Sequence, residues 1–174
     1  HGESGTGKTS LIRAGLMPRL SPDVFVPVYV RVLSDPLREI TRELLRQLNL
    51  QDANLADLPL AEFLTAVTER VSKTVIIVFD QFEEFFLRFD EDVRRRAIAE
   101  LAACLTAARL DVKFLIAIRS DYFAQLAEFE DALPQIFTHQ IHLERLTEAQ
   151  AVEAVIKPAE RLGIQVDEPM AQIK

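Results

Sequence analysis

The feature that most constrains this chain is a glycine-rich segment, Gly-Glu-Ser-Gly-Thr-Gly-Lys-Thr at residues 2–9, which matches the phosphate-binding pattern G-x-x-x-x-G-K-[ST] throughout. Phosphate oxygens need several converging N–H donors, and glycine lets the backbone curl tightly enough to present them. Lys8 supplies charge for the β and γ phosphates, and the Thr9 hydroxyl suits Mg²⁺. The helix expected to begin near Lys8 adds the positive end of its dipole.

This segment predicts a site for a nucleoside triphosphate. A glycine-rich turn before an ordinary helix is the other interpretation, and the match at all eight positions makes it the weaker one. The residues predicted to bind the nucleotide are Gly2, Glu3, Ser4, Gly5, Thr6, Gly7, Lys8, Thr9 and Ser10.

Length and composition point to a single domain in a reducing compartment. The chain has 174 residues, 49% of them hydrophobic, and a formal charge of −7. This acidity disfavours nonspecific binding to nucleic acid or to an anionic membrane, and no apolar run approaches the ~20 residues of a membrane span. The single cysteine, Cys104, excludes an internal disulfide and lies in an apolar helical pattern, where we expect it to be buried. We expect a cytoplasmic protein.

Strand and helix patterns alternate along the chain, which predicts an α/β fold of three layers around a parallel sheet. The continuously apolar segment 74–79 suggests a strand that is buried on both faces, and 112–118 suggests a second buried strand of the same kind. Thr147 and Gln150 form a capping box before the last helix, Pro158 is expected to break or kink that helix, and Gly163 to end it. The other predicted strands are 24–32 and 139–143, and the other helices are 8–16 (ended by Gly15 and Pro18), 37–48, 60–71 and 91–109.

The second half of the predicted site follows the strand at 74–79. Asp80 stands at its carboxyl end, where the strands of a parallel sheet present ligand-binding residues, and we expect it to hold Mg²⁺ opposite Thr9 through water. Glu83 and Glu84 follow at a reach suited to orienting an attacking water. Sequence reasoning leaves open which of them is catalytic, with Glu84 slightly favoured, and solvated loop charges are the alternative.

Arg119 follows the strand at 112–118 and is the third predicted catalytic residue, placed to contact the γ-phosphate. An ion pair with Asp121 or with the acidic residues after Asp80 is an equally supported alternative, and a nucleotide could exchange one partner for the other. The phenylalanines at 82, 85, 86 and 89 predict core packing, and the arginines at 94–96 a solvated helix face. His139 and His142 have no metal-ligand companions.

Taken together, these residues resemble the STAND class of signal-transduction P-loop NTPases, specifically the bacterial novel STAND domain. The first motif alone indicates only a P-loop. Ala-Gly-Leu-Met-Pro (14–18) and Asp-Gln-Phe-Glu-Glu (80–84) narrow the resemblance to this family. It continues through Asp-Pro-Leu (35–37), Ala-Ile-Arg-Ser-Asp-Tyr-Phe (117–123), Leu-Thr-Glu-Ala-Gln (146–150) and Ile-Lys-Pro-Ala (156–159).

The resemblance implies an ATP/ADP switch with slow Mg²⁺-dependent hydrolysis. Such a switch belongs to a larger protein with fused effector and sensor-repeat domains, which forms homo-oligomers in its ATP state. By position, Lys8 and Thr9 bind phosphate and Mg²⁺, Asp80 is the acid on the metal side, and Arg119 is the sensor arginine. The chain divides into an NTPase core over 1–145 and the start of a helical lid over 146–174. Because the loop normally follows a buried strand, we expect this chain to be part of a longer protein, in which the first core strand precedes the loop.

Two other functions stay open at this point. A non-catalytic scaffold could keep the fold and bind nucleotide for structural reasons alone, although it would not need the Lys8, Thr9 and Asp80 set. A DNA-associated ATPase of the AAA+ kind would need a basic surface, which disagrees with the charge of −7. The sequence carries no direct signal for nucleic-acid or membrane partners.

Overall fold

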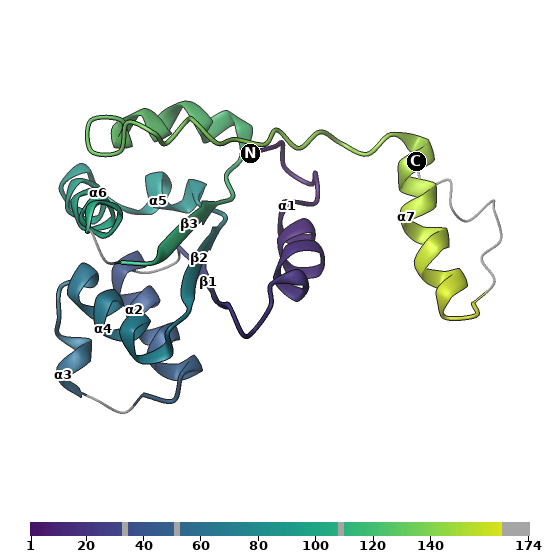
Figure 1. The fold of residues 1–174 in the computed structure, drawn as a ribbon. Coiled ribbons are helices and arrows are strands. Elements are labelled where there is room, and N and C mark those ends of the chain that lie inside the picture. The colour runs from purple at the N-terminus through teal and green to yellow at the C-terminus, as the bar shows by residue number, and fades with distance from the viewer. Residues whose placement is uncertain (33–34, 51–52, 108–109, 165–174) are drawn as a thin grey trace.

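A computed structural model describes residues 1–32, 35–50, 53–107 and 110–164. Its centre is a sheet of three parallel strands in the order β1-β2-β3, with β1 at Phe25–Arg31, β2 at Thr74–Asp80 and β3 at Val112–Ile116 (Figure 1). All three match predicted strands. Parallel neighbours need crossover connections, and helices supply them on the way from each strand to the next.

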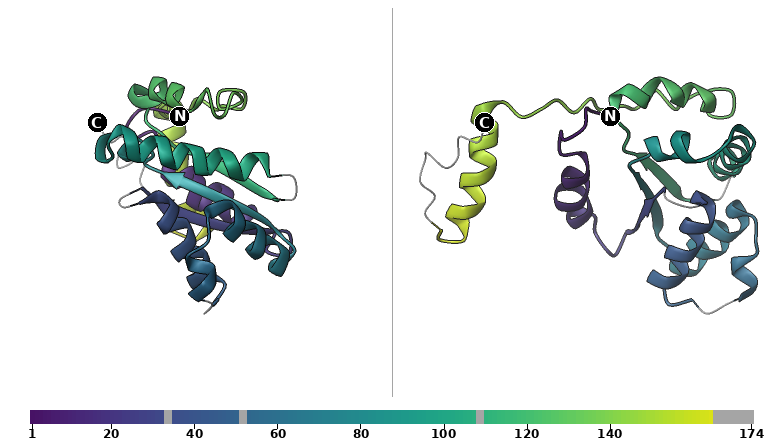
Figure 2. Two further views of the ribbon diagram at one scale, coloured as in Figure 1. Left: turned by 90° about the vertical axis from the view of Figure 1, so that its left-hand side faces the viewer. Right: turned by 180° about the vertical axis from the view of Figure 1, so that it is seen from behind.

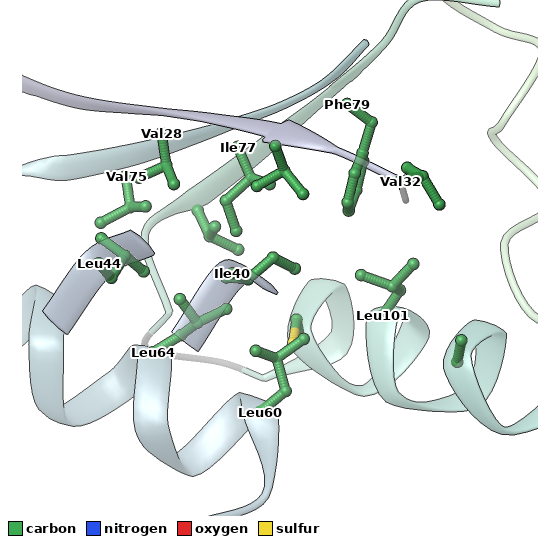
Figure 3. Close-up of a cluster of buried hydrophobic side chains, with 14 of the residues drawn as sticks. Val28, Val32, Ile40, Leu44, Leu60, Leu64, Val75, Ile77, Phe79 and Leu101 are labelled. Carbon is green, nitrogen blue, oxygen red and sulfur yellow. The ribbon is translucent and has the colours of Figure 1, made fainter. Parts of the chain in front are cut away.

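The larger core lies on one face of the sheet. Val26, Val28 and Val30 of β1 point to this face by alternation, and Val75, Ile77 and Phe79 of β2 lie beside them. They pack against α2 (Pro36–Gln47), α4 (Leu60–Val71) and α6 (Glu91–Thr106), which contribute Ile40, Leu44, Leu64 and Leu101 (Figure 3). Cys104 of α6 is buried in the same core, as predicted.

The opposite face carries a smaller cluster under the helical segment that follows the glycine-rich loop. Ile12 packs there against Val78 and Ala117. The segment is α-helical at α1 (Lys8–Ser10), π-helical at η1 (Leu11–Leu16) and 3-10 at η2 (Met17–Arg19). Helices on both faces of a parallel sheet give the three predicted layers.

The first helical segment ends later than predicted. Gly15 and Pro18 were expected to end it near Leu16. Instead, Gly15 lies inside η1 and Pro18 inside η2, and the helical segment continues to Arg19. Pro18 is tolerated because it lies in the first turn of η2, where the backbone N–H groups have no partner within the helix. The chain becomes extended at Leu20.

The prediction of a strand at 139–143 is wrong. Of its residues only Leu143 makes a bridge, in parallel with Gly2, and Gly2 bridges Arg119 on its other side. The Leu143 N–H donates to the His1 carbonyl at 2.7 Å, and the Gly2 N–H donates to the Ile118 carbonyl at 3.3 Å. Residues 1–2 therefore lie between the end of β3 and residue 143, which puts the glycine-rich loop at the carboxyl edge of the sheet.

The aromatic residues after β2 form core, as predicted. Phe82, the N-cap of α5 (Glu83–Arg88), packs together with Phe85 and Phe86 of that helix against Phe129 of η3 (Ser120–Phe129), with ring centroids 5.7–6.4 Å from that of Phe129. The solvated face predicted at 94–96 is wrong for Arg94. Its guanidinium bonds both carboxylate oxygens of Glu128, at 2.8 and 3.1 Å, and thereby ties α6 to η3.

The remaining helices depart little from prediction. α3 (Ala53–Ala56) is a short helix between α2 and α4 that was not predicted, and α6 ends at Thr106, with 108–109 outside the described residues. α7 (Glu148–Arg161) begins with the predicted capping box, but it continues through Pro158, where a break or kink was predicted. It ends at Arg161, two residues before Gly163, whose φ is +71°. Figures 1 and 2 show α7 set apart from the sheet, and none of its residues is buried. The rest of the predicted lid, 165–174, lies outside the described residues.

Candidate nucleotide-binding site

The glycine-rich loop has the open curl that phosphate binding requires. Gly5 and Gly7 have φ of +81° and +85°, a region that other residues adopt only at a cost. Thr6 closes the turn by donating its N–H and its hydroxyl to the Glu3 carbonyl, at 3.4 and 3.0 Å. Ser4, Gly5 and Gly7 are exposed, so this stretch of backbone is accessible to a ligand.

The Lys8 ammonium folds back over this loop. It donates to the carbonyl oxygens of Gly2 and Glu3, at 2.8 and 2.7 Å. Both acceptors are neutral, whereas a phosphate oxygen is charged and makes a stronger bond to an ammonium. Lys8 is therefore held at the loop by partners that an anion could displace. Ser10, the last residue of the predicted set, is exposed in α1.

The structure brings Asp80 and Thr9 together. Thr9 Oγ1 donates to Asp80 Oδ2 at 2.8 Å, and the Asp80 side chain is buried. The Tyr29 hydroxyl donates to the same oxygen. Partial burial, and then the bond to Asp80, raises the pKa of Tyr29, so its hydroxyl stays protonated as a donor. Sequence reasoning missed Tyr29, which alternation in β1 places on the sheet face that the loop helix covers.

The two glutamates have different surroundings. Glu83 is buried, and its Oε2 accepts the backbone N–H of Arg119 at 3.2 Å. Glu84 instead pairs with Arg88 of its own helix at 2.6 Å. A sharp turn at Gln81, where φ is +56°, starts α5 directly at the end of β2 and aims Glu83 at the end of β3.

Arg119 lies beside the start of the loop. Ser120, the next residue, donates its N–H to the Gly2 carbonyl at 3.1 Å. The Arg119 guanidinium bonds both oxygens of Asp121, at 3.1 and 2.6 Å, and this pairing raises the pKa of Arg119. The ion pair that sequence analysis gave as the alternative is thus present.

A hollow of about 390 Å³ opens beside the loop. It is lined by Ser4, Gly5, Thr6 and Gly7 together with Arg145 and Leu146. Arg145 also forms an ion pair with Glu3 at 2.8 Å, and both side chains are exposed. Arg145 and Leu146, just before α7, therefore line the hollow beside the loop, a role for which the sequence carried no signal. A larger groove of about 1050 Å³ between α2, α4 and α6 contains none of the predicted site residues.

Other kinds of site find no support in the part of the chain that the structure describes. Within it, no three or more His, Cys, Asp or Glu side chains gather in a way that could hold a metal ion. His142 stacks on the His1 ring at 4.7 Å, and His1 stacks on Phe123 at 4.0 Å. No helix among the described ranges is long and apolar enough to cross a membrane.

The sequence family is matched over nearly the whole chain. A family model described as Novel STAND NTPase 1 matches residues 1–173. No curated protein matches the chain.

Solved structures share the fold at low sequence identity. The ADP form of the Aeropyrum pernix ORC2 protein matches with a TM-score of 0.67 at 18% sequence identity, and the match covers 92% of this chain and 45% of the ORC2 chain. For the ADPNP–ADP complexes of the same protein, the TM-score is 0.66 at 17% identity, and the match covers 91% of this chain and 44% of the ORC2 chain. For the Walker-type ATPase PABY2304 of Pyrococcus abyssi, the TM-score is 0.60 at 15% identity, and the match covers 98% of this chain and 55% of the ATPase chain. This chain thus spans about half the length of these proteins.

Proposed function

The chain belongs to the novel STAND NTPase 1 family, and from this premise we propose that it binds ATP and ADP and hydrolyses ATP slowly with Mg²⁺, as a regulatory switch. The observation that carries the proposal is the contact between Thr9 and Asp80. It brings the hydroxyl of the glycine-rich loop within 2.8 Å of the acid at the end of the central strand. In P-loop NTPases these two groups hold the metal of the bound nucleotide.

The donor set fits Mg²⁺. Thr9 and Asp80 offer oxygen atoms only, which Mg²⁺ prefers, and two residues suffice when phosphates and water complete the coordination. The Thr9 oxygen has lone pairs to offer a metal while its hydrogen stays on Asp80. When bound, Mg²⁺ neutralises charge on the phosphates.

The protein side chains then exchange partners when nucleotide binds. Lys8 leaves the carbonyls of Gly2 and Glu3 for phosphate oxygens, because a charged acceptor makes the stronger bond. In this proposal Arg119 exchanges Asp121 for the γ-phosphate, and its backbone stays fixed by Glu83. The ion pair seen here is the resting arrangement of that arginine.

Glu83 is the better candidate for orienting the attacking water. It is buried and directed at the start of Arg119, next to Gly2, whereas Glu84 is engaged by Arg88. This reverses the slight preference for Glu84 that the sequence alone suggested. Glu84 then serves to anchor α5.

Thermal unfolding tests nucleotide binding directly. A ligand at 100 times its dissociation constant adds about 2.7 kcal/mol of stability, which is roughly 5–10 °C for a domain of this size. We expect Mg²⁺-ATP and ADP each to give such a shift and Lys8→Ala to lose it. Lys113→Ala, at an exposed position of β3, is the matched control. If the folded parent shows no shift with either nucleotide, it is a scaffold rather than a switch.

Single-turnover hydrolysis separates the two glutamates. We expect Glu83→Gln to bind ATP like the parent and to hydrolyse it about 10²-fold more slowly, the lower range for a lost general base. Glu84→Gln should stay close to the parent rate. A loss of hydrolysis confined to Glu84→Gln would instead assign the role to Glu84.

The switch itself includes oligomerisation in the ATP state and fused effector and sensor domains. The exposure of α7 supports the oligomerisation, since none of its residues is buried and its surface is open to a neighbouring protein. We propose that 1–145 is the NTPase core and that 146–174 begins the lid. Light scattering in ADP and in a non-hydrolysable ATP analogue tests the oligomerisation, and equal masses with the two nucleotides would contradict it.

A further inference from the structure

Tyr29 contacts the candidate metal site without having a role in the chemistry above. We propose that it is a positioning residue, which fixes the Asp80 carboxylate in the orientation that the metal requires. This inference rests on the proposed function and assigns the site one more residue.

The two strands bring Tyr29 to Asp80. Tyr29 pairs in register with Val78, and both lie on the sheet face that carries the smaller cluster under the loop helix. From there the hydroxyl reaches forward to Asp80 Oδ2, the oxygen that also accepts from Thr9. Asp80 is thus held from β1 and from the loop helix at once.

Burial makes this support necessary. Only 1% of Asp80 is exposed, and a buried carboxylate is costly unless donors replace its lost water. Thr9 supplies one donor, but its oxygen is also the expected metal ligand, so its position depends on the nucleotide. Tyr29 donates from β1, outside the glycine-rich loop that is proposed to bind the nucleotide. Two hydroxyls on one oxygen restrict rotation of the carboxylate without using Oδ1.

Arg13 holds the tyrosine in place. Its guanidinium lies 4.4 Å from the centre of the Tyr29 ring, close enough for a cation–π interaction. Arg13 stands four residues after Thr9, in the π-helical segment η1. The same helical segment therefore carries the metal ligand and the clamp on the residue that orients Asp80, and π-helical segments are frequent at functional sites.

Metal affinity tests this role without relying on catalysis. Mn²⁺ binding to the ADP-loaded chain, followed by electron paramagnetic resonance, gives a dissociation constant for the metal alone. We expect Tyr29→Phe to raise that constant about tenfold, the effect of losing one hydrogen bond to a charged group. ADP affinity without metal should not change. Thr74→Val is the matched control, because it removes a hydroxyl that donates to Asp111 at the other end of β2.

A double-mutant cycle locates the effect. In an Asp80→Asn background, Tyr29→Phe should add little, because both changes act through one contact. An unchanged Mn²⁺ constant in Tyr29→Phe, or fully additive effects in the double variant, would overturn the inference. A parent that binds Mn²⁺ and ADP normally in that experiment leaves the proposed function standing, whereas a parent that binds no ADP contradicts it.

Should Tyr29→Phe fail to fold, Arg13→Gln carries the test, because Arg13 is exposed and its loss disturbs no core. We expect a two- to threefold rise in the Mn²⁺ constant, a smaller effect because the hydroxyl remains (about 0.5 kcal/mol, the lower range for an exposed cation–π contact). No rise would count against the role of Tyr29.

Discussion

At the scale of single residues, the start of the loop has no space for a side chain. A Cβ on Gly2 would lie 2.5 Å from the Leu143 carbonyl oxygen and 2.8 Å from Thr6 Oγ1. The first contact is with backbone that is itself bridged to Gly2, so neither partner can yield without loss of that bridge. We expect Gly2→Ala to lower the free energy of unfolding by roughly 1–3 kcal/mol, measured by urea denaturation.

Gly15→Ala is the control for that substitution. Its Cβ would come closest to the tip of the exposed Leu11 side chain, at 3.2 Å, and this tip can move aside. Alanine also loses less backbone entropy than glycine on forming a helix, so this variant should be neutral or gain up to about 1 kcal/mol. Equal losses in the two variants would show that the contacts at Gly2 do not matter.

Cys104 gives the fold a pH dependence. Burial, and then the charge of Glu100, raises the pKa of its thiol from 9.0 to about 12. The folded state keeps this proton while the unfolded state loses it, so stability is complete below pH 9 and falls as the pH rises towards 12. Between pH 8.5 and 10 the parent should lose about 1 kcal/mol more than Cys104→Ala. Parallel losses in urea denaturation at the two pH values would contradict this.

Some residues of the candidate site could be predicted from the sequence, and others depend on contacts between distant segments. The glycine-rich loop and Asp80 were predictable, because each has a local pattern: a motif in one case and the end of a buried strand in the other. Tyr29 is one of several apolar or aromatic residues in its strand, and only the register of β1 on β2 brings it to Asp80. The difference between Glu83 and Glu84 likewise depends on the turn at Gln81.

At the scale of elements, the positions of β2, β3 and α4 were predicted, and α4 is found at the predicted residues, 60–71. The prediction that both strands are buried on both faces fails for β3, where only Val112 is buried and Lys113 is exposed. The strand at 139–143 was wrong because residues 139, 140, 141 and 142 have no bridge partner and Leu143 has only Gly2. η3 was missed because a 3-10 helix lacks the 3.6-residue repeat that identifies an α-helix.

The start of α4 depends on a side chain from another helix. Its N-cap is Pro59, which offers no side-chain acceptor, and the Leu60 N–H instead donates to Glu100 Oε2 of α6 at 3.2 Å. Removal of this acceptor leaves a buried helix terminus with an unsatisfied donor. We expect Glu100→Ala to destabilise the chain by roughly 1–2 kcal/mol in urea denaturation.

Two further variants check the origin of that loss. Glu100→Gln should lose less, since its amide oxygen can still accept the Leu60 N–H. Glu69→Ala, at an exposed position later in α4, should have almost no effect. A loss in Glu100→Gln as large as in Glu100→Ala would assign the effect to charge rather than to capping.

At the scale of the whole molecule, the two faces of the sheet have different roles. The large core under α2, α4 and α6 stabilises the sheet, while the opposite face carries a small cluster, the loop helix and the candidate site. Thr9, Tyr29 and Arg13 all belong to this second face, where few packing contacts oppose a small shift of the loop helix. A nucleotide could therefore move the loop helix without disturbing the larger core.

The charge of the whole chain bears on the remaining alternative, a DNA-associated ATPase. The 27 acidic and 20 basic side chains leave a net charge of −7. Exposed arginines are mostly neutralised locally, as in the pairs of Arg42 with Glu39, Arg46 with Glu43 and Arg95 with Glu91. Nonspecific DNA binding comes almost entirely from unpaired positive charge, and its dissociation constants are typically about 10⁻⁴–10⁻⁶ M at physiological salt.

We therefore expect no gel shift with duplex DNA at about 10 μM chain and about 150 mM salt, with or without ATP. A charge-reversed variant, Glu39→Lys with Glu43→Lys, provides the positive control, because it frees Arg42 and Arg46 and adds two lysines to one face of α2. If the parent binds and the shift weakens steeply with salt, a basic surface outside these ion pairs exists, and the DNA-associated alternative replaces the switch. If only the reversed variant binds, the ion pairs on α2 are what keep this surface from binding DNA.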